Sequence, residues 1–79
     1  MTVEEIHNRV VATASVLFRT DLSTINAESS IEQIPTWDSV AHLNFILALE
    51  QEFQCGFNDA EIESLISISS IVQVISSKQ

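Results

Sequence analysis

The stretch that decides the fold is residues 35–53, PTWDSVAHLNFILALEQEF. Pro35 closes an irregular segment, and Asp38 is a side chain that often accepts a hydrogen bond from the first turn of a helix. Neither Gly nor Pro interrupts residues 39–53, so this segment is predicted to be a helix that begins at Ser39. One arc of this helix forms the predicted core face, which contains Phe45, Ile46, Leu49 and Phe53, with His42 among them.

The same helix is apolar on a second side. Val40, Leu43 and Leu47 fall on a different arc, beside Ser39 and Glu50. A chain of 79 residues offers little surface against which both arcs could be buried. Either Leu43 and Leu47 contact the first helix or the long loop, or they form a surface patch for a partner.

Upstream, the sequence predicts one helix and a long connection. In residues 3–18 apolar side chains recur at helical spacing, and Thr2 with Glu5 forms a capping-box pattern. Residues 19–38 show no sustained period and are long for a loop in a compact domain. The segment SSIE can cap one short turn near residue 30, and the apolar anchors of the loop are predicted to be Ile25, Ile31 and Ile34.

Downstream, two further helices are predicted. Gly56 is expected to end the helix of residues 39–53 in a left-handed conformation. The segment NDAE, residues 58–61, is a second capping-box pattern and predicts a short helix over about residues 59–65. Ser67 is expected to cap a fourth helix, whose core face is formed by Ile68, Ile71, Val72 and Ile75.

The predicted architecture is all-α. We expect a small four-helix bundle with three longer helices, one short helix and a long loop between the first and second helices. The length of 79 residues suffices for one domain, residues 1–79. Apolar runs are only a few residues long, and the N-terminus lacks the layout of a signal peptide. We therefore expect a cytoplasmic monomer with no membrane span.

The net charge of the chain limits the classes of partner that it can bind. Eleven Asp and Glu residues stand against three Lys and Arg, which gives a formal net charge of −8. Nucleic acids and anionic membrane surfaces repel such a chain, so we expect it to bind neither. The acidity either keeps a small protein in solution or steers it toward basic surfaces of partner proteins.

Catalytic and metal-binding patterns are not found. His7 and His42 are the two histidines, and neither belongs to a zinc-binding HExxH pair. His42 can neighbour Ser39 on a helix, but Asp38 would point away from the orienting position of a triad, and no oxyanion loop is visible. Cys55 has no CxxC partner, and the acids lack the spacing of a calcium loop. We expect neither a hydrolase nor a metal site, and we interpret Cys55 as a packing residue.

Among eleven serines, Ser39 is distinguished by its position. If Asp38 caps the helix, Ser39 is its first residue, where backbone N–H groups lack intrahelical partners and the helix dipole is positive. A phosphoryl group on this hydroxyl would lie in a favourable field. By position alone, however, Ser39 is better explained as a residue that simply opens a helix.

Three segments of the chain resemble acyl and peptidyl carrier proteins. WDSVAHLNFILALEQEF resembles the modification site and recognition helix of that family, whose signature is Asp-Ser followed by a bulky aliphatic residue, here Asp38-Ser39-Val40. SSIEQIPTWDS resembles the loop that leads to the site, and FNDAEIESLISISSIVQVI resembles the third and fourth helices. The resemblance covers nearly the whole chain in register.

This resemblance implies a function. Ser39 would receive 4′-phosphopantetheine covalently from coenzyme A through a phosphopantetheinyl transferase, and Asp38 would support the transferase and its divalent metal. The thiol of the arm would hold acyl, polyketide or aminoacyl cargo as a thioester, while the chain itself catalyses nothing. Further partners would be loading enzymes and synthases with basic docking surfaces, which we expect to meet Val40, Leu43, Leu47 and Glu50.

Some features depart from carriers of primary fatty-acid synthesis. Their recognition helix is usually rich in acids, whereas here the early outer positions are Ala41, His42 and Asn44, which suggests a specialised pathway. His42 either lines the mouth of a cargo pocket or is a partly buried helix residue. The alternative function is a carrier-like protein-interaction module without a cofactor. The pair Asp38-Ser39 favours the carrier, because such a module has no need of it.

Overall fold

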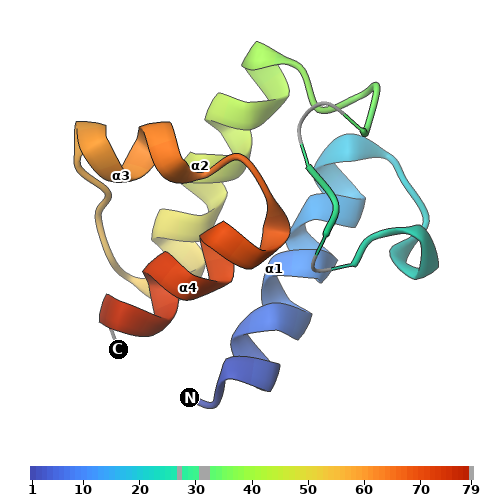
Figure 1. The fold of residues 1–79 in the computed structure, drawn as a ribbon. Coiled ribbons are helices and arrows are strands. Elements are labelled where there is room, and N and C mark those ends of the chain that lie inside the picture. The colour runs from blue at the N-terminus through green and yellow to red at the C-terminus, as the bar shows by residue number, and fades with distance from the viewer. Residues whose placement is uncertain (27, 31–32, 79) are drawn as a thin grey trace.

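Four α-helices and one short 3-10 helix occur in the part of the chain that the computed structural model describes, residues 1–26, 28–30 and 33–78. They are α1 (Val3–Phe18), η1 (Leu22–Thr24), α2 (Ser39–Phe53), α3 (Asp59–Ser64) and α4 (Ile68–Lys78). α1 packs against both α2 and α4, and α3 lies between α2 and α4 along the chain (Figure 1). The predicted all-α bundle is confirmed. Among these residues, none of the helices combines the length and apolar character needed to cross a membrane.

The predicted helix starts are confirmed by their capping bonds. At α1 the Thr2 hydroxyl accepts from the Glu5 N–H at 3.2 Å, and the Glu5 carboxylate accepts from the Thr2 N–H at 3.2 Å. At α3 Asn58 and Glu61 make the same reciprocal pair at 2.8 and 2.9 Å. At α4 the Ser67 hydroxyl accepts from the backbone N–H three residues later, at 3.2 Å. Each cap supplies acceptors for N–H groups that the helix leaves free.

The end of α2 corrects one prediction. The left-handed residue is Gln54, with φ 50° and ψ 52°, and its N–H donates to the Glu50 carbonyl. Gly56 has a negative φ, so it does not end the helix in the predicted way. The physical reason is position, because the left-handed residue must follow the last helical residue directly, and that residue is Phe53. Gln54 therefore adopts the conformation that a glycine would adopt more easily.

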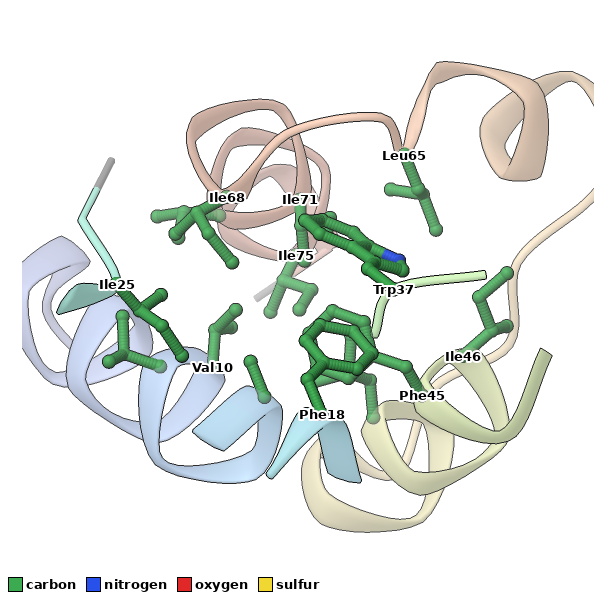
Figure 2. Packing of buried hydrophobic residues seen from close by; sticks show 14 of the residues in the cluster. Val10, Phe18, Ile25, Trp37, Phe45, Ile46, Leu65, Ile68, Ile71 and Ile75 are labelled. Carbon is green, nitrogen blue, oxygen red and sulfur yellow. The ribbon is translucent and has the colours of Figure 1, made fainter. Parts of the chain in front are cut away.

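Aromatic side chains occupy the centre of the core. Phe18 stacks on Trp37 with ring centroids 4.8 Å apart, and Phe45 meets these rings edge-on, at 5.0 and 5.7 Å. Figure 2 shows the three rings beside the isoleucines of α4. Such arrangements stabilise by about 0.5–1.5 kcal/mol per pair beyond area burial. The predicted core faces of α2 and α4 are confirmed, since the buried residues include Phe45, Ile46, Leu49, Phe53, Ile68, Ile71, Val72 and Ile75.

The long loop is held to the bundle by its own residues. Ile25 and Ile34 are buried, as predicted, and Trp37, which no sequence pattern singles out, is only 1% exposed. The Ser29 carbonyl accepts from the Ile68 N–H at 2.9 Å, which joins the loop to the start of α4. The predicted anchor Ile31, and with it the predicted SSIE turn, lies outside the described residues.

Candidate functional site

Ser39 is the first residue of α2 and is exposed. The residue before it, Asp38, is the N-cap, and its Oδ1 accepts from the Ala41 N–H at 2.8 Å. This confirms the predicted start of the helix. The hydroxyl of Ser39 makes no hydrogen bond within the described part of the chain. It is therefore presented to solvent at the positive end of a fifteen-residue helix.

The backbone on both sides of Ser39 is fixed by one buried indole. Trp37 lies two residues before Ser39, and its Nε1–H donates to Nδ1 of His42, three residues after Ser39, at 2.9 Å. The Trp37 N–H also donates to the Ile34 carbonyl at 2.9 Å. A core side chain and a bond across the helix start therefore hold the serine in place, although it lies at the end of a long loop.

His42 is half-buried, and its surroundings favour the neutral form of its imidazole ring. Its ring lies 5.9 Å from the Trp37 ring, centroid to centroid. Burial lowers the pKa of the imidazole below its ordinary 6.5. Because Nδ1 accepts the indole proton, the neutral ring carries its own proton on Nε2. Of the two interpretations of His42, the geometry supplies a structural role, and a role at the mouth of a cargo pocket stays a prediction.

A hollow of about 330 Å³ opens beside Ser39, between the end of α1, the end of the loop and the start of α2. The Thr36 and Thr20 hydroxyls both donate to the Phe18 carbonyl, so the loop is tied to the end of α1 three residues before Ser39. No sequence pattern predicts this hollow, since its walls come from segments far apart in the chain. It is lined by Leu17, Phe18, Arg19, Thr36, Asp38, Val40, Ala41 and Asn44.

The second apolar side of α2 is solvent-facing. Val40, Leu43 and Leu47 are 71%, 59% and 52% exposed. Of the two interpretations, these values favour a surface patch over contact with the first helix or the loop. Glu50 lies on the same side but is half-buried, and its carboxylate accepts from the Phe57 N–H at 3.0 Å. Glu50 therefore also holds the connection between α2 and α3.

Cys55 belongs to this connection and not to the surroundings of Ser39. It is half-buried, packs against the core cluster and makes no disulfide. Burial raises the pKa of its thiol above the ordinary 9.0, so the thiolate is disfavoured. The position agrees with the packing role predicted for it.

No family model matches the chain. The function of the site is therefore inferred from its residues and their geometry.

Proposed function

We propose that this chain is a carrier protein whose Ser39 Oγ bears a 4′-phosphopantetheine arm transferred from coenzyme A. One observation carries the proposal. The hydroxyl of Ser39 is exposed at the first residue of α2, directly after the capping Asp38, and buried Trp37 fixes the backbone that presents it. In the Asp-Ser-aliphatic pattern this is the serine to which the resemblance assigns the arm.

The residues around Ser39 fit such a group. The Ser39 and Val40 N–H groups, in the first turn of α2, have no intrahelical partners, and the dipole favours an anion there. The residues that line the adjacent hollow include apolar residues, Asn44, Arg19 and the acidic Asp38. The amide and guanidinium donors suit a phosphodiester, and the apolar residues suit the uncharged carbon chain that follows it.

The transfer requires little of the carrier beyond a presented hydroxyl. The Ser39 oxygen forms the new bond to phosphorus, its proton leaves, and adenosine 3′,5′-bisphosphate departs from coenzyme A. Asp38 uses Oδ1 for the helix cap, which leaves its other carboxylate oxygen for the divalent metal of a transferase. When bound, the arm supplies a thiol that holds cargo as a thioester.

The exposed side of α2 is the proposed docking face for partner enzymes. It consists of the exposed Val40, Leu43 and Leu47 with the half-buried Glu50, and it adjoins Ser39 on the same helix. Any enzyme that acts on a group tethered to Ser39 must approach this end of the bundle. The charge of −8 favours partners with basic surfaces. The proposed setting is a specialised acyl, polyketide or aminoacyl pathway of the cytoplasm.

The test is intact mass after incubation with coenzyme A, Mg²⁺ and broad-specificity phosphopantetheinyl transferases. We expect the wild type to gain one arm and Ser39→Ala to gain none. Ser69→Ala is the matched control, because Ser69 is an exposed serine in the first turn of α4, and it should gain the arm normally. No gain in the wild type with several transferases would contradict the carrier function. An equal gain in Ser39→Ala would contradict the site.

The second candidate is a protein-interaction module without a cofactor. The exposed Val40, Leu43 and Leu47 favour it, because an apolar helix side can bind a partner without any arm. The two candidates differ in what Ser39→Ala does. A module keeps its partner when the hydroxyl is removed, whereas a carrier loses every reaction that needs the thioester.

A further inference from the structure

Arg19 differs from the other two cations of this acidic chain. Arg9 pairs with Glu52 at 3.1 Å, and Lys78 pairs with Glu61 at 2.8 Å. Arg19 forms no ion pair with any residue that the structure describes, and it is exposed. In a chain of net charge −8, a guanidinium that has no ion pair among the described residues is a local positive site on a negative surface.

The position of Arg19 is fixed by the backbone at the end of α1. Arg19 is the C-cap residue, with φ 52° and ψ 44°, and its N–H donates to the Ser15 carbonyl. The preceding residue, Phe18, accepts the Thr36 hydroxyl through its carbonyl, which ties this end of α1 to the approach to Ser39. The left-handed cap therefore lies at the edge of the hollow beside the serine.

Arg19 lines the same hollow as both neighbours of Ser39. Asp38 and Val40 line it at the start of α2, and Arg19 lines it as the C-cap of α1. A phosphodiester on the Ser39 oxygen would add a negative charge on the residue next to Asp38. This charge and the Asp38 carboxylate would repel each other. Among the described residues that line this hollow, Arg19 is the one cationic residue.

We propose that Arg19 is a positioning residue for the phosphate of the group that Ser39 bears. This inference rests on the proposed function and adds a residue that the Asp-Ser-aliphatic pattern does not contain. A guanidinium matches phosphate oxygens with two parallel N–H donors, and in Arg19 it is carried on a long, flexible stem at the edge of this hollow. The contact would hold the phosphate at the edge of the hollow, whose apolar lining residues come from the ends of α1 and α2. Because Arg19 is exposed, the effect is modest and is weakened by salt.

Arg19→Gln removes the charge without disturbing the cap. The chain itself shows that Gln accepts this backbone, since Gln54 adopts φ 50° at the end of α2. Arg9→Gln is the matched control, because it removes the same charge from the same helix at a residue paired with Glu52. Each protein is converted fully to the modified form, as judged by intact mass, and is compared with its unmodified form.

The readouts are thermal unfolding of both forms and the ³¹P signal of the phosphodiester. We expect Arg19→Gln to lower the Tm of the modified form by about 2–4 °C more than that of the unmodified form. This additional loss of Tm in the modified form should be smaller at about 0.5 M NaCl. The ³¹P signal should shift relative to wild type. Arg9→Gln should lower both forms equally and leave the ³¹P signal in place.

Three results overturn the inference, and they are distinguishable. Equal losses in the two forms of Arg19→Gln, with an unmoved ³¹P signal, would mean that Arg19 contributes to the stability of the fold and not to the position of the phosphate. If Arg19→Gln folds but does not accept the arm, while Arg9→Gln accepts it, Arg19 contacts the transferase and does not position the phosphate. No mass gain in the wild type overturns the proposed function together with this inference.

Discussion

The indole N–H of Trp37 donates to Nδ1 of His42 at 2.9 Å, and this bond spans Ser39. Trp37 ends the long loop inside the core, and His42 lies in the second turn of α2. The pair therefore couples the packing of the core to the presentation of the serine. It also makes the protonation of one imidazole matter for the fold, because a protonated Nδ1 is a donor and cannot accept the indole proton.

The first prediction concerns pH. Burial lowers the pKa of His42 in the folded state below 6.5, so the unfolded chain binds the proton first as pH falls. The free energy of unfolding should therefore decrease below about pH 6.5 and level off below the folded pKa. In His42→Gln, whose amide oxygen can still accept from Trp37, this decrease should vanish. Denaturant unfolding followed by the fluorescence of Trp37, the single tryptophan, measures it.

The effect of His42 is measured by the difference between the wild type and His42→Gln in how the free energy of unfolding depends on pH, because the wild-type curve alone contains other contributions. Acidification also relieves the repulsion within a chain of net charge −8, and this adds a stabilising contribution to the pH dependence of every variant. Hydrogen bonds hold the pKa of Glu5 and of Glu61 below 4.5, so both carboxylates stay ionised between about pH 5.5 and 8. His7→Gln is the control and should follow the wild type. If His42→Gln also follows it, the Trp37–His42 bond has no part in the pH dependence.

The second prediction concerns the aromatic core. Phe45 is fully buried and contacts the rings of Phe18 and Trp37 edge-on. Phe45→Ala should lower the free energy of unfolding by about 3–5 kcal/mol, because it removes apolar contacts and leaves a cavity. That is a large share of the roughly 5–15 kcal/mol that stabilises a typical domain. Thermal and denaturant unfolding measure it.

The matched surface change is Val16→Ala, since Val16 lies on α1 and is 76% exposed. It should change the free energy of unfolding by less than about 0.5 kcal/mol. A Phe45→Ala protein as stable as wild type would mean that the core face of α2 is assigned incorrectly.

The third prediction separates the two roles of Asp38. Asp38→Ala loses the cap on the Ala41 N–H and should cost about 1 kcal/mol of stability. Asp38→Asn keeps an oxygen acceptor and should melt within a few degrees of wild type. If the carboxylate also serves the metal of a transferase, both variants should accept the arm at least about tenfold more slowly. A wild-type rate for Asp38→Asn would limit Asp38 to capping.

Much of the fold follows from local patterns in the sequence. Pro35, Asp38 and an uninterrupted run predict α2 with the observed ends, Ser39 and Phe53, because caps and breakers act over a few residues. The core faces follow from helical period for the same reason. Ser39 and Asp38 are located in this way as well, since both depend on where the helix begins.

The rest depends on contacts that no local pattern records. Trp37 lies in an aperiodic loop, so its burial is decided by the distant ring of Phe18. The hydrogen bond from the Thr36 hydroxyl to the Phe18 carbonyl spans eighteen residues of the sequence, and both residues line the hollow that Arg19 also lines. The left-handed residue after α2 is decided by where the last turn closes, which is why Gln54 takes that conformation and Gly56 does not.

The fourth prediction concerns docking on the exposed side of α2. Leu43 and Leu47 are more than half exposed, so replacing them should leave the melting temperature nearly unchanged. Apolar residues at the centre of an interface contribute most of its binding energy, whereas rim charges mainly set on-rate and salt dependence. Leu43→Asp and Leu47→Ala should therefore weaken binding to the transferase or a loading enzyme by roughly tenfold, or about 1.4 kcal/mol.

Two comparisons make this test specific to the docking face. Glu50→Gln keeps an oxygen for the Phe57 N–H and removes one charge from the rim, so it should weaken binding less than either leucine variant. Val16→Asp adds the same charge as Leu43→Asp at an exposed valine of α1, and it should bind normally. Salt should weaken binding because the chain carries −8, but less than for a carrier whose recognition helix is strongly acidic. The measurements are partner binding and the rate of arm transfer, with melting as a check of the fold. If both leucine variants fold and react at the wild-type rate with every partner, docking lies on another face of the bundle.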